Sequence, residues 1–381
     1  MRPGERTSVL HVTQAVDAGV ARCVQDFADD QAQRGWRVAV ACPPDGELAS
    51  AVRRGESEHL EWHAQREPGA SVVRETRQLG RLLERWRPDL VHLHSSKAGL
   101  AGRLAVRGRV PTLFQPHGWS FYAVDGLRRT AAVRWERFAT RWADAVVCVS
   151  EGEAQAGEVE RIRARSRVAP NGIDLVAYSL ASADDRRAAR AELALPETPL
   201  AVSVGRVARQ KGHDVLLAAW GSIVERIREA TLVVVGDGPD REALSERAPE
   251  NVRFVGPRTD VSVWLAAADV VVLPSRWEAG ASLAMLEAMA RGRSVVTTSV
   301  AGSEAVEGAG AIVPVDDAPA LTGAVTERLL DPDRATREGL VGRRTAERAF
   351  DHRQTRQVLA GIYGDVLAAR RSPSVSRRDS S

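Results

Sequence analysis

Short apolar runs rich in β-branched residues alternate with longer stretches of helical periodicity along the first half of the chain. Runs that are apolar throughout predict strands buried on both faces of a sheet, and apolar residues three and four apart predict helices that cover it. The strands predicted here are residues 8–12, 38–41, 90–94, 112–114 and 145–150, and the helices are 20–34, 79–86 and 127–143. This order indicates βαβ units and a parallel sheet.

The same alternation begins again after a polar segment. Residues 176–199 are rich in Ala, Asp and Arg, which predicts a linker with a short helix. The strands predicted beyond it are residues 200–204, 231–235, 252–255, 270–273, 294–298 and 311–315, and the helices are 214–227, 261–268, 283–290 and 353–369. The repeated pattern predicts an α/β fold of two doubly wound domains that face each other across a cleft.

The domain boundaries follow from the same alternation. We expect an N-terminal Rossmann-like domain over residues 1–175 and a C-terminal Rossmann-like domain over residues 200–352, joined by the linker 176–199. The helix 353–369 lies beyond the second set of strands and is a candidate to return to the first domain. Residues 370–381 carry few apolar side chains, which predicts a disordered tail.

One stretch places two carboxylates where a strand ends. Glu278 lies in the small-residue loop between the strand 270–273 and the helix 283–290, and Glu287 is the only polar residue of that helix. The helix is apolar nearly all round, so Glu287 is expected to be buried and to need partners. Two partners stay open: Arg291 one turn later, or a pair of ligand hydroxyls bound by the carboxylate.

Composition narrows the class of protein. The chain has 53 basic and 50 acidic residues, a formal charge of +3, which gives no indication of a nucleic-acid partner. Three cysteines without CxxC spacing argue against a disulfide framework or structural zinc and fit a reducing compartment. No apolar run is long enough for a membrane span, and no signal peptide begins the chain. We therefore expect a cytoplasmic protein, at most peripheral on a membrane.

Polar residues also follow strands of the first half. His94 ends one predicted strand with Lys97 just beyond it, and His117 follows the next. A single histidine is usually structural, but two at equivalent strand ends raise the case for a site. Gly19 precedes the helix 20–34, so it marks either a place for anions at the helix start or a routine turn.

Two cations flank the turn after the strand 200–204. Arg206 and Lys211 beside a helix start could clamp a diphosphate without metal, or they could be solvated loop residues. Asp331-Pro332-Asp333 matches an acidic metal-binding triplet in form only, because it follows a helix rather than a strand. We read it as a helix stop and expect no metal site.

The helix 127–143 carries an apolar stripe beside a basic one. The apolar residues are Ala131, Trp135, Phe138 and Trp142, and the basic residues are Arg134, Arg137 and Arg141. The favoured interpretation packs the aromatic side inward and leaves the arginines in water. The alternative is a basic amphipathic surface that approaches anionic lipid headgroups.

Three segments resemble the family 4 glycosyltransferases, which have the GT-B fold. PSRWEAGASLAMLEAMA is similar to the family's signature loop and helix, GRVARQKGHDVLL to its phosphate-binding segment, and PNGID to the end of its N-terminal domain. The family usually separates its two glutamates by seven residues, whereas eight separate Glu278 from Glu287 here. The extra residue is either absorbed as a bulge or moves the first carboxylate off the sugar.

The resemblance implies a metal-independent, retaining transfer of a sugar from a nucleotide diphosphate sugar, UDP- or GDP-linked, with no other cofactor. Glu278 and His117 would act at the reacting sugar. The donor would be bound by Arg206, Lys211, Glu287, the backbone of Ala281, Ser282 and Leu283, and the strand-end residues Gly205, Gly236 and Arg258. Gly19 and Lys97 would lie on the acceptor side. The expected acceptor is a saccharide, lipid-linked in cell-surface polysaccharide assembly, with an anionic membrane surface as a further partner.

Two other classes stay open. The eight-residue gap could mark a non-catalytic chain that binds a nucleotide sugar or pairs with an active enzyme. A two-domain Rossmann enzyme such as a sugar-nucleotide epimerase would show the same alternation of strands and helices. A donor hydrolysis assay would separate the non-catalytic chain from an active transferase, and an epimerised product would reveal the epimerase.

Overall fold

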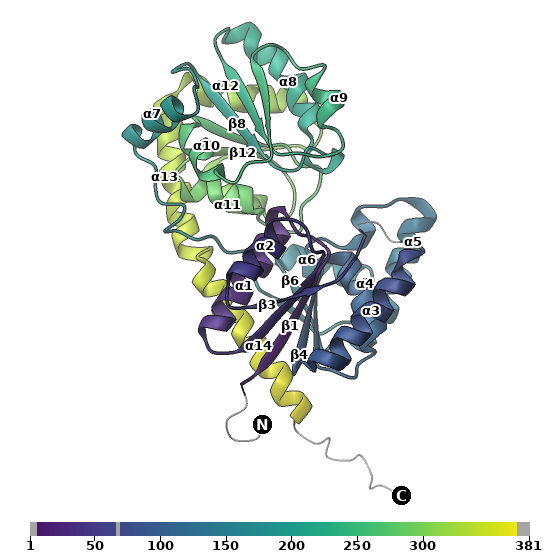
Figure 1. Ribbon diagram of the computed structural model, residues 1–381. Coiled ribbons are helices and arrows are strands. Elements are labelled where there is room, and N and C mark those ends of the chain that lie inside the picture. Colours follow the sequence, from purple (N-terminus) through teal and green to yellow (C-terminus); the bar gives the residue numbers. More distant parts are fainter. Residues whose placement is uncertain (1–5, 66–68, 372–381) are drawn as a thin grey trace, which may run out of the picture. The chain divides into compact units, whose positions relative to one another are not determined.

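The computed structural model describes residues 6–65 and 69–371 (Figure 1). They form two compact units, one made of residues before Pro170 and after Thr355 and the other of the residues between. In each unit a single sheet, parallel throughout, has helices on both faces. The expected fold class, two doubly wound α/β domains, is confirmed.

The first unit contains a seven-stranded sheet in the order β3-β2-β1-β4-β5-β6-β7. Its strands are β1 (Ser8–Thr13), β2 (Arg37–Cys42), β3 (Glu58–Glu61), β4 (Leu90–His94), β5 (Thr112–Gln115), β6 (Ala145–Cys148) and β7 (Ser166–Val168). Its helices are α1 (Ala18–Gln33), α2 (Glu47–Arg54), α3 (Ser71–Trp86), α4 (Ser95–Val106), α5 (Gly126–Ala139), α6 (Glu151–Val159) and the later part of α14 (His352–Arg371), with 3₁₀ turns η1 (Ser120–Tyr122) and η2 (Thr140–Trp142).

Two apolar cores hold the helices of this unit against the sheet. Helices α1, α2 and α14 share one core with side chains of the central strands, and α3, α4, α5 and α6 share the other. Helix α14 contributes Leu359, Tyr363 and Val366 to the first of these cores. Burial of that apolar face is what joins the last helix of the chain to the N-terminal sheet.

The favoured interpretation of the amphipathic helix is right for its arginines, since Arg134, Arg137 and Arg141 are exposed, but only partly right for its aromatic side. The residues that α5 buries are Val133, Glu136 and Ala139, whereas Phe138 remains 43% exposed. The cause is an ion pair between Glu136 and Arg103 of α4, both buried, with 2.8 Å between Oε2 and Nη2. Because Glu136 faces the interior, Phe138 turns toward the surface, whereas Trp135 stays half-buried with the Arg103 guanidinium 5.5 Å from its ring centroid.

The second unit contains a six-stranded sheet in the order β10-β9-β8-β11-β12-β13. Its strands are β8 (Leu200–Val204), β9 (Thr231–Val235), β10 (Val252–Gly256), β11 (Val270–Leu273), β12 (Ser294–Thr298) and β13 (Gly310–Val313). Its helices are α7 (Ala183–Glu192), α8 (His213–Arg226), α9 (Arg241–Ser245), α10 (Val261–Ala267), α11 (Leu283–Ala290), α12 (Ala318–Leu330) and α13 (Pro332–Ala349), with 3₁₀ turns η3 (Arg209–Lys211) and η4 (Ser303–Val306).

The segment expected to be a linker packs into this unit. Helix α7 buries Ala189 in the same core as α10 and α11, while α8 and α12 cover the other face of the sheet. Asp331 ends α12 and caps α13 by accepting from the backbone N–H of Arg334 at 2.9 Å, so the acidic triplet is a helix stop and start.

The last helix extends to Arg371, two residues beyond its expected end, and the rest of the predicted tail lies outside the described residues. Within residues 6–65 and 69–371, none of the helices has the length and apolar character needed to cross a membrane.

Candidate functional site

Each sheet has one point where the strand order reverses. In the first unit β1 pairs with both β2 and β4, and in the second unit β8 pairs with both β9 and β11. Loops from the carboxyl ends of such strand pairs diverge and leave room for a ligand. Every site residue that the sequence singled out lies within one of the two units.

In the second unit, glycines let three strand ends approach one another. A Cβ on Gly236, which has φ +141°, would lie 2.0 Å from the carbonyl oxygen of Gly205, and a Cβ on Gly212, with φ +66°, would lie 2.0 Å from that of Pro274. Only glycine fits at these two positions. The loops after β8, β9 and β11 therefore meet backbone to backbone.

This packing brings Lys211 to Glu278. The ammonium Nζ of Lys211 donates to Oε1 of Glu278, and the Ser275 hydroxyl donates to the same oxygen at 2.6 Å. The two loops are also tied by Gln210, whose Nε2 donates to the carbonyl oxygen of Trp277 at 3.0 Å. The loop with the extra residue thus holds its carboxylate beside the expected diphosphate cation.

Glu287 is 1% exposed on α11, which packs in the core of the unit. Ser282 caps this helix, its hydroxyl accepting from the N–H of Met285 at 3.4 Å, and Asn171 Nδ2 donates to the carbonyl oxygen of Ala281 at 2.9 Å. The guanidinium of Arg291 donates through Nη1 to the carbonyl oxygen of Ser179 at 2.9 Å. Ala281, Ser282 and Leu283 thus lie at a capped helix N-terminus, where anions are stabilised.

The other donor-side residues differ in their surroundings. Arg206 is exposed in the turn after β8. Arg258 forms a bidentate pair with Asp260, with 2.9 Å from Nε to Oδ1 and 2.7 Å from Nη2 to Oδ2. That pair gives Arg258 a partner at the start of α10 without any ligand.

In the first unit, the backbone is strained at the carboxyl edge. His117 follows β5 with φ +51°, Ser95 follows β4 with φ +66°, and Ala18 opens α1 with φ +62°. Non-glycine residues adopt the left-handed region at a cost of about 1–3 kcal/mol, and such residues cluster at functional sites. Gly19 lies in the first turn of α1, beside one of these strained residues.

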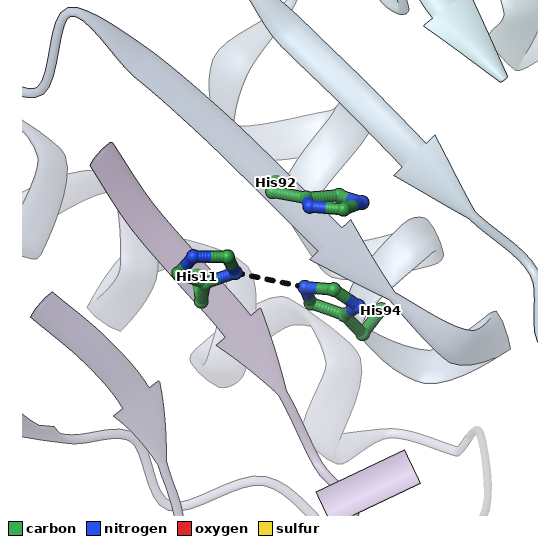
Figure 2. Close-up of side chains that lie close together, drawn as sticks. All are labelled: His11, His92 and His94. Atoms are coloured by element: carbon green, nitrogen blue, oxygen red, sulfur yellow. Dashed lines mark hydrogen bonds between the residues drawn. The ribbon is translucent and has the colours of Figure 1, made fainter. Parts of the chain in front are cut away.

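Four histidines gather at this edge. His11 on β1 and His92 and His94 on β4 are fully buried, and His117 is half-buried. His94 Nδ1 lies 3.2 Å from His117 Nε2, and His94 Nε2 lies 3.0 Å from His11 Nδ1 (Figure 2). In the described part of the chain, His11, His92 and His94 are the one group whose nitrogens, all within 4.8 Å of one another, could hold a metal ion.

A buried carboxylate holds the backbone next to His117. Glu153, in the first turn of α6, accepts from the N–H of Gly118 at 2.6 Å and from the N–H of Val149 at 2.8 Å. Burial raises the pKa of Glu153 to about 7, against the effect of the two backbone N–H donors. The bond from Gly118 to Glu153 thereby stabilises the left-handed turn at His117 and Gly118.

Lys97 is buried in an ion pair within the first unit. Its ammonium lies 2.8 Å from Oε2 of Glu75 on α3, and both side chains are buried. Glu75 also accepts from the backbone N–H of Gln65 at 2.9 Å. Because the ion pair ties α4 to α3 inside the unit, the acceptor-side role expected of Lys97 is replaced by a structural one.

Sequence reasoning missed several residues of the first edge. His11 lies within an apolar strand, and Glu153 lies in a helix with no periodic signal. The one available signal was the alternation of His92 and His94, which places both on the same face of β4.

Comparisons with known proteins agree with this architecture. Residues 18–176 match the sequence profile described as glycosyltransferase family 4, and residues 198–331 match that described as glycosyl transferases group 1. Anabaena Alr3699/HepE, solved in complex with UDP and glucose, superposes with a TM-score of 0.82 at 21% identity, over 94% of this chain and 100% of that one. The fold is that of the GT-B glycosyltransferases.

Two relatives are more similar in sequence. The Escherichia coli UDP-Gal:alpha-D-GlcNAc-diphosphoundecaprenol alpha-1,3-galactosyltransferase is 30% identical over 59% of this chain and 61% of its own length. This chain therefore covers less than two thirds of that relative. The lipopolysaccharide core biosynthesis mannosyltransferase LpsB of Rhizobium meliloti is 30% identical over 61% of this chain and 69% of its own. The chain belongs to the family 4 glycosyltransferases.

Proposed function

We propose that this chain transfers a hexose from a UDP- or GDP-linked donor to a lipid-linked saccharide, with retention of anomeric configuration and without a metal ion or other cofactor. The observation that carries the proposal is the pairing of Lys211 with Glu278 at the reversal point of the second sheet. A cation and a carboxylate in contact there supply opposite charges for the two ends of a breaking sugar–diphosphate bond.

The donor would lie along the carboxyl edge of that sheet. Glu287 would accept from the ribose hydroxyls, and Arg206, Lys211 and the N-terminus of α11 would face the diphosphate. With two cations and a helix N-terminus available, the diphosphate needs no metal ion for neutralisation. HepE was solved with UDP, and the name of the Escherichia coli relative specifies UDP-Gal, which supports a nucleotide diphosphate sugar as donor.

Each of these residues would stabilise one of the charges that develop during transfer. The bond from the anomeric carbon to the diphosphate oxygen breaks with its electron pair on the oxygen, and Lys211 and Arg206 stabilise that anion. The oxocarbenium-like sugar is stabilised by Glu278, and His117 would bind one of its hydroxyls. The acceptor hydroxyl bonds to the same face and gives its proton to the departing diphosphate.

Support for a lipid-linked acceptor comes from the surface of α5. Leu127 is 90% exposed and Phe138 43% exposed, with arginines beside them on the same helix. Such a surface suits the boundary between lipid headgroups and acyl chains. Because the Escherichia coli relative is named for a diphosphoundecaprenol acceptor, we assign a polyprenyl-diphosphate saccharide at the cytoplasmic face of a membrane, and no nucleic-acid partner.

The test is a transfer assay with full-length protein in EDTA. UDP- and GDP-hexoses are offered with polyprenyl-diphosphate-linked N-acetylglucosamine, and the anomeric configuration of the product is read by NMR. We expect one donor to give a product with the donor's own configuration. An inverted product, or transfer restored only by manganese or magnesium, contradicts the mechanism, and nucleotide binding without any turnover identifies a non-catalytic chain.

A further inference from the structure

We propose that His94, His11 and Gln31 act as positioning residues that fix the tautomer of His117, so that its Nδ1 faces the site as a hydrogen-bond acceptor. The inference rests on the proposed function only in the statement that His117 binds the transferred sugar. The series of hydrogen-bonded side chains lies entirely within the first unit.

Four side chains, from β4, β1, α1 and the loop after β5, form one unbroken series. Nε2 of His117 lies 3.2 Å from Nδ1 of His94, and Nε2 of His94 lies 3.0 Å from Nδ1 of His11. Nε2 of His11 lies 2.8 Å from Oε1 of Gln31. Figure 2 shows the central link, in which the rings on β1 and β4 meet edge to edge across the point of strand reversal.

The inner end of the series has a fixed direction. Gln31 is buried on α1 and turns its amide oxygen Oε1 to Nε2 of His11 at 2.8 Å. An amide oxygen only accepts, so Nε2 of His11 carries the proton of that bond.

The proton on Nε2 of His11 sets the donor and acceptor nitrogens of the next two rings, provided that each ring is neutral. Burial lowers the pKa of His11 and of His117 to about 4 and that of His94 well below its ordinary value, so all three are neutral at pH 7. A neutral imidazole has one bare nitrogen. Nδ1 of His11 is bare and accepts from Nε2–H of His94, whose Nδ1 accepts from Nε2–H of His117. Nδ1 of His117 is left bare.

The consequence is a choice of ligand group. His117 is half-buried at the sheet edge, with its left-handed backbone held by Glu153 through Gly118. A bare Nδ1 accepts a hydrogen bond from a hydroxyl and offers no proton to an oxyanion. The site is thereby suited to a neutral sugar hydroxyl at this position and unsuited to a carboxylate or phosphate.

A metal ion held by His11, His92 and His94 is the competing explanation for the cluster. The rings of His92 and His94 lie over one another, with centroids 3.9 Å apart, and Nδ1 of His92 lies 2.7 Å from the hydroxyl of Tyr363. Metal ligands direct in-plane lone pairs at one point, whereas here Nε2 of His94 and Nδ1 of His11 lie at the distance of a single shared proton. The contacts therefore favour the hydrogen-bonded series.

NMR of protein labelled with ¹⁵N-histidine tests the tautomers without any assay of activity. At pH 7.5 we expect His11, His94 and His117 to carry the proton on Nε2. His11→Phe removes the acceptor of His94, so His117 should become a mixture of tautomers. Gln31→Leu, which removes only the amide oxygen at the inner end of the series, should have the same effect. It replaces His11→Phe in the experiment if that variant fails to fold. His92→Phe is the control for packing, since His92 is equally buried on β4 and its ring lies against that of His94, but it has no hydrogen bond within the series.

Donor kinetics give the second readout. His11→Phe and Gln31→Leu should lower kcat/KM for the donor about tenfold, with His92→Phe within about twofold of wild type. Protonation of His117 at Nδ1 in the wild type, an equal change in His92→Phe, or one equivalent of bound transition metal in the purified protein overturns the inference. Absence of transfer activity with the expected tautomers would instead count against the proposed function alone.

Discussion

Lys211 donates to the carboxylate of Glu278 across two loops of the second unit, and Ser275 donates to the same oxygen at 2.6 Å. Neither Lys211 nor Glu278 is more than about a quarter exposed, with side-chain values of 22% and 11%. The pair holds the cation at the edge of the sheet before any ligand arrives. A diphosphate bound there would share Lys211 with the carboxylate.

Replacing Lys211 by Met should weaken binding of UDP or GDP by about tenfold or more, because a charge-assisted hydrogen bond is lost. Calorimetric titration measures the affinity. Arg209→Met is the control, since Arg209 is an exposed cation two residues away in the same turn. Equal losses in the two variants would show a general charge effect and remove Lys211 from the diphosphate site.

Replacing Glu278 by Gln keeps the size of the side chain and removes its charge. We expect kcat for transfer to fall about a hundredfold, since one group that stabilises the transition state is lost, while nucleotide affinity changes by less than about threefold. Glu307→Gln, at an exposed position of the same unit, should behave as wild type. An unchanged kcat in Glu278→Gln would mean that the longer loop has moved the carboxylate off the sugar.

Hydrophobic periodicity was sufficient to predict most central strands, because strands buried on both faces are apolar throughout. It missed β3 and β7, which are short edge strands with half-exposed residues. The orientation of α5 was not predictable from its own residues, since it is set by the pairing of Glu136 with Arg103 on another helix. His11 gave no signal either, because it meets His94, 83 residues away, only through the pairing of β1 with β4.

Candidate site residues could be predicted from local sequence in the second unit but less well in the first. The loop and helix residues after β8 and β11 are close in sequence to their strands, so a local pattern was enough to single out Lys211, Glu278 and Glu287 as candidates, and the structure pairs the first two. Lys97 was misassigned because its partner Glu75 lies on a preceding helix, and nothing in the local sequence indicates that pairing.

The surface of α5 predicts binding to anionic membranes. Arg134 and Arg141 are exposed, with the guanidinium of Arg141 stacked over Phe138 at 3.9 Å from the ring centroid. The double change of Arg134 and Arg141 to Gln should weaken binding to phosphatidylglycerol vesicles by roughly 1 kcal/mol per arginine at low salt. A sedimentation assay measures the bound fraction.

The control for the membrane prediction is the double change of Arg226 and Arg228 to Gln, two exposed arginines of the second unit. Neutral vesicles provide the matching lipid control. If wild-type protein ignores anionic vesicles at low salt, the membrane part of the proposal fails, and the donor site is unaffected.

The buried histidines predict a loss of stability in mild acid. Burial lowers the pKa of His11 to about 4 from an ordinary value of 6.5, and it lowers the pKa of His92 and of His94 well below that ordinary value. Between about pH 6.5 and 4 the unfolded chain binds a proton at each position that the folded chain does not. The free energy of unfolding should therefore fall by about 1.4 kcal/mol per pH unit for each histidine as the pH drops.

Glu153 acts in the opposite direction, since its raised pKa makes the folded state bind a proton more tightly between about pH 4.5 and 7. One carboxyl offsets one histidine, so the net slope remains a loss toward acid. Urea unfolding at pH 7.5, 6 and 5 measures it. The slope should be smaller in His11→Phe, and a stability that is flat or rises over this range would show that the histidines are charged in the folded protein.

The donor site is tested most directly by calorimetric titration of UDP and GDP into full-length protein in EDTA, comparing wild type with Glu287→Ala. One of the two nucleotides should bind the wild type with one-to-one stoichiometry. Glu287→Ala should lose about 1–3 kcal/mol of binding free energy, because the ribose hydroxyls lose their acceptor, with Glu246→Ala as an exposed control on the same unit. Failure of both nucleotides to bind without metal, or equal affinity in Glu287→Ala with only its unfolding midpoint changed, would contradict the assignment of this edge as the donor site.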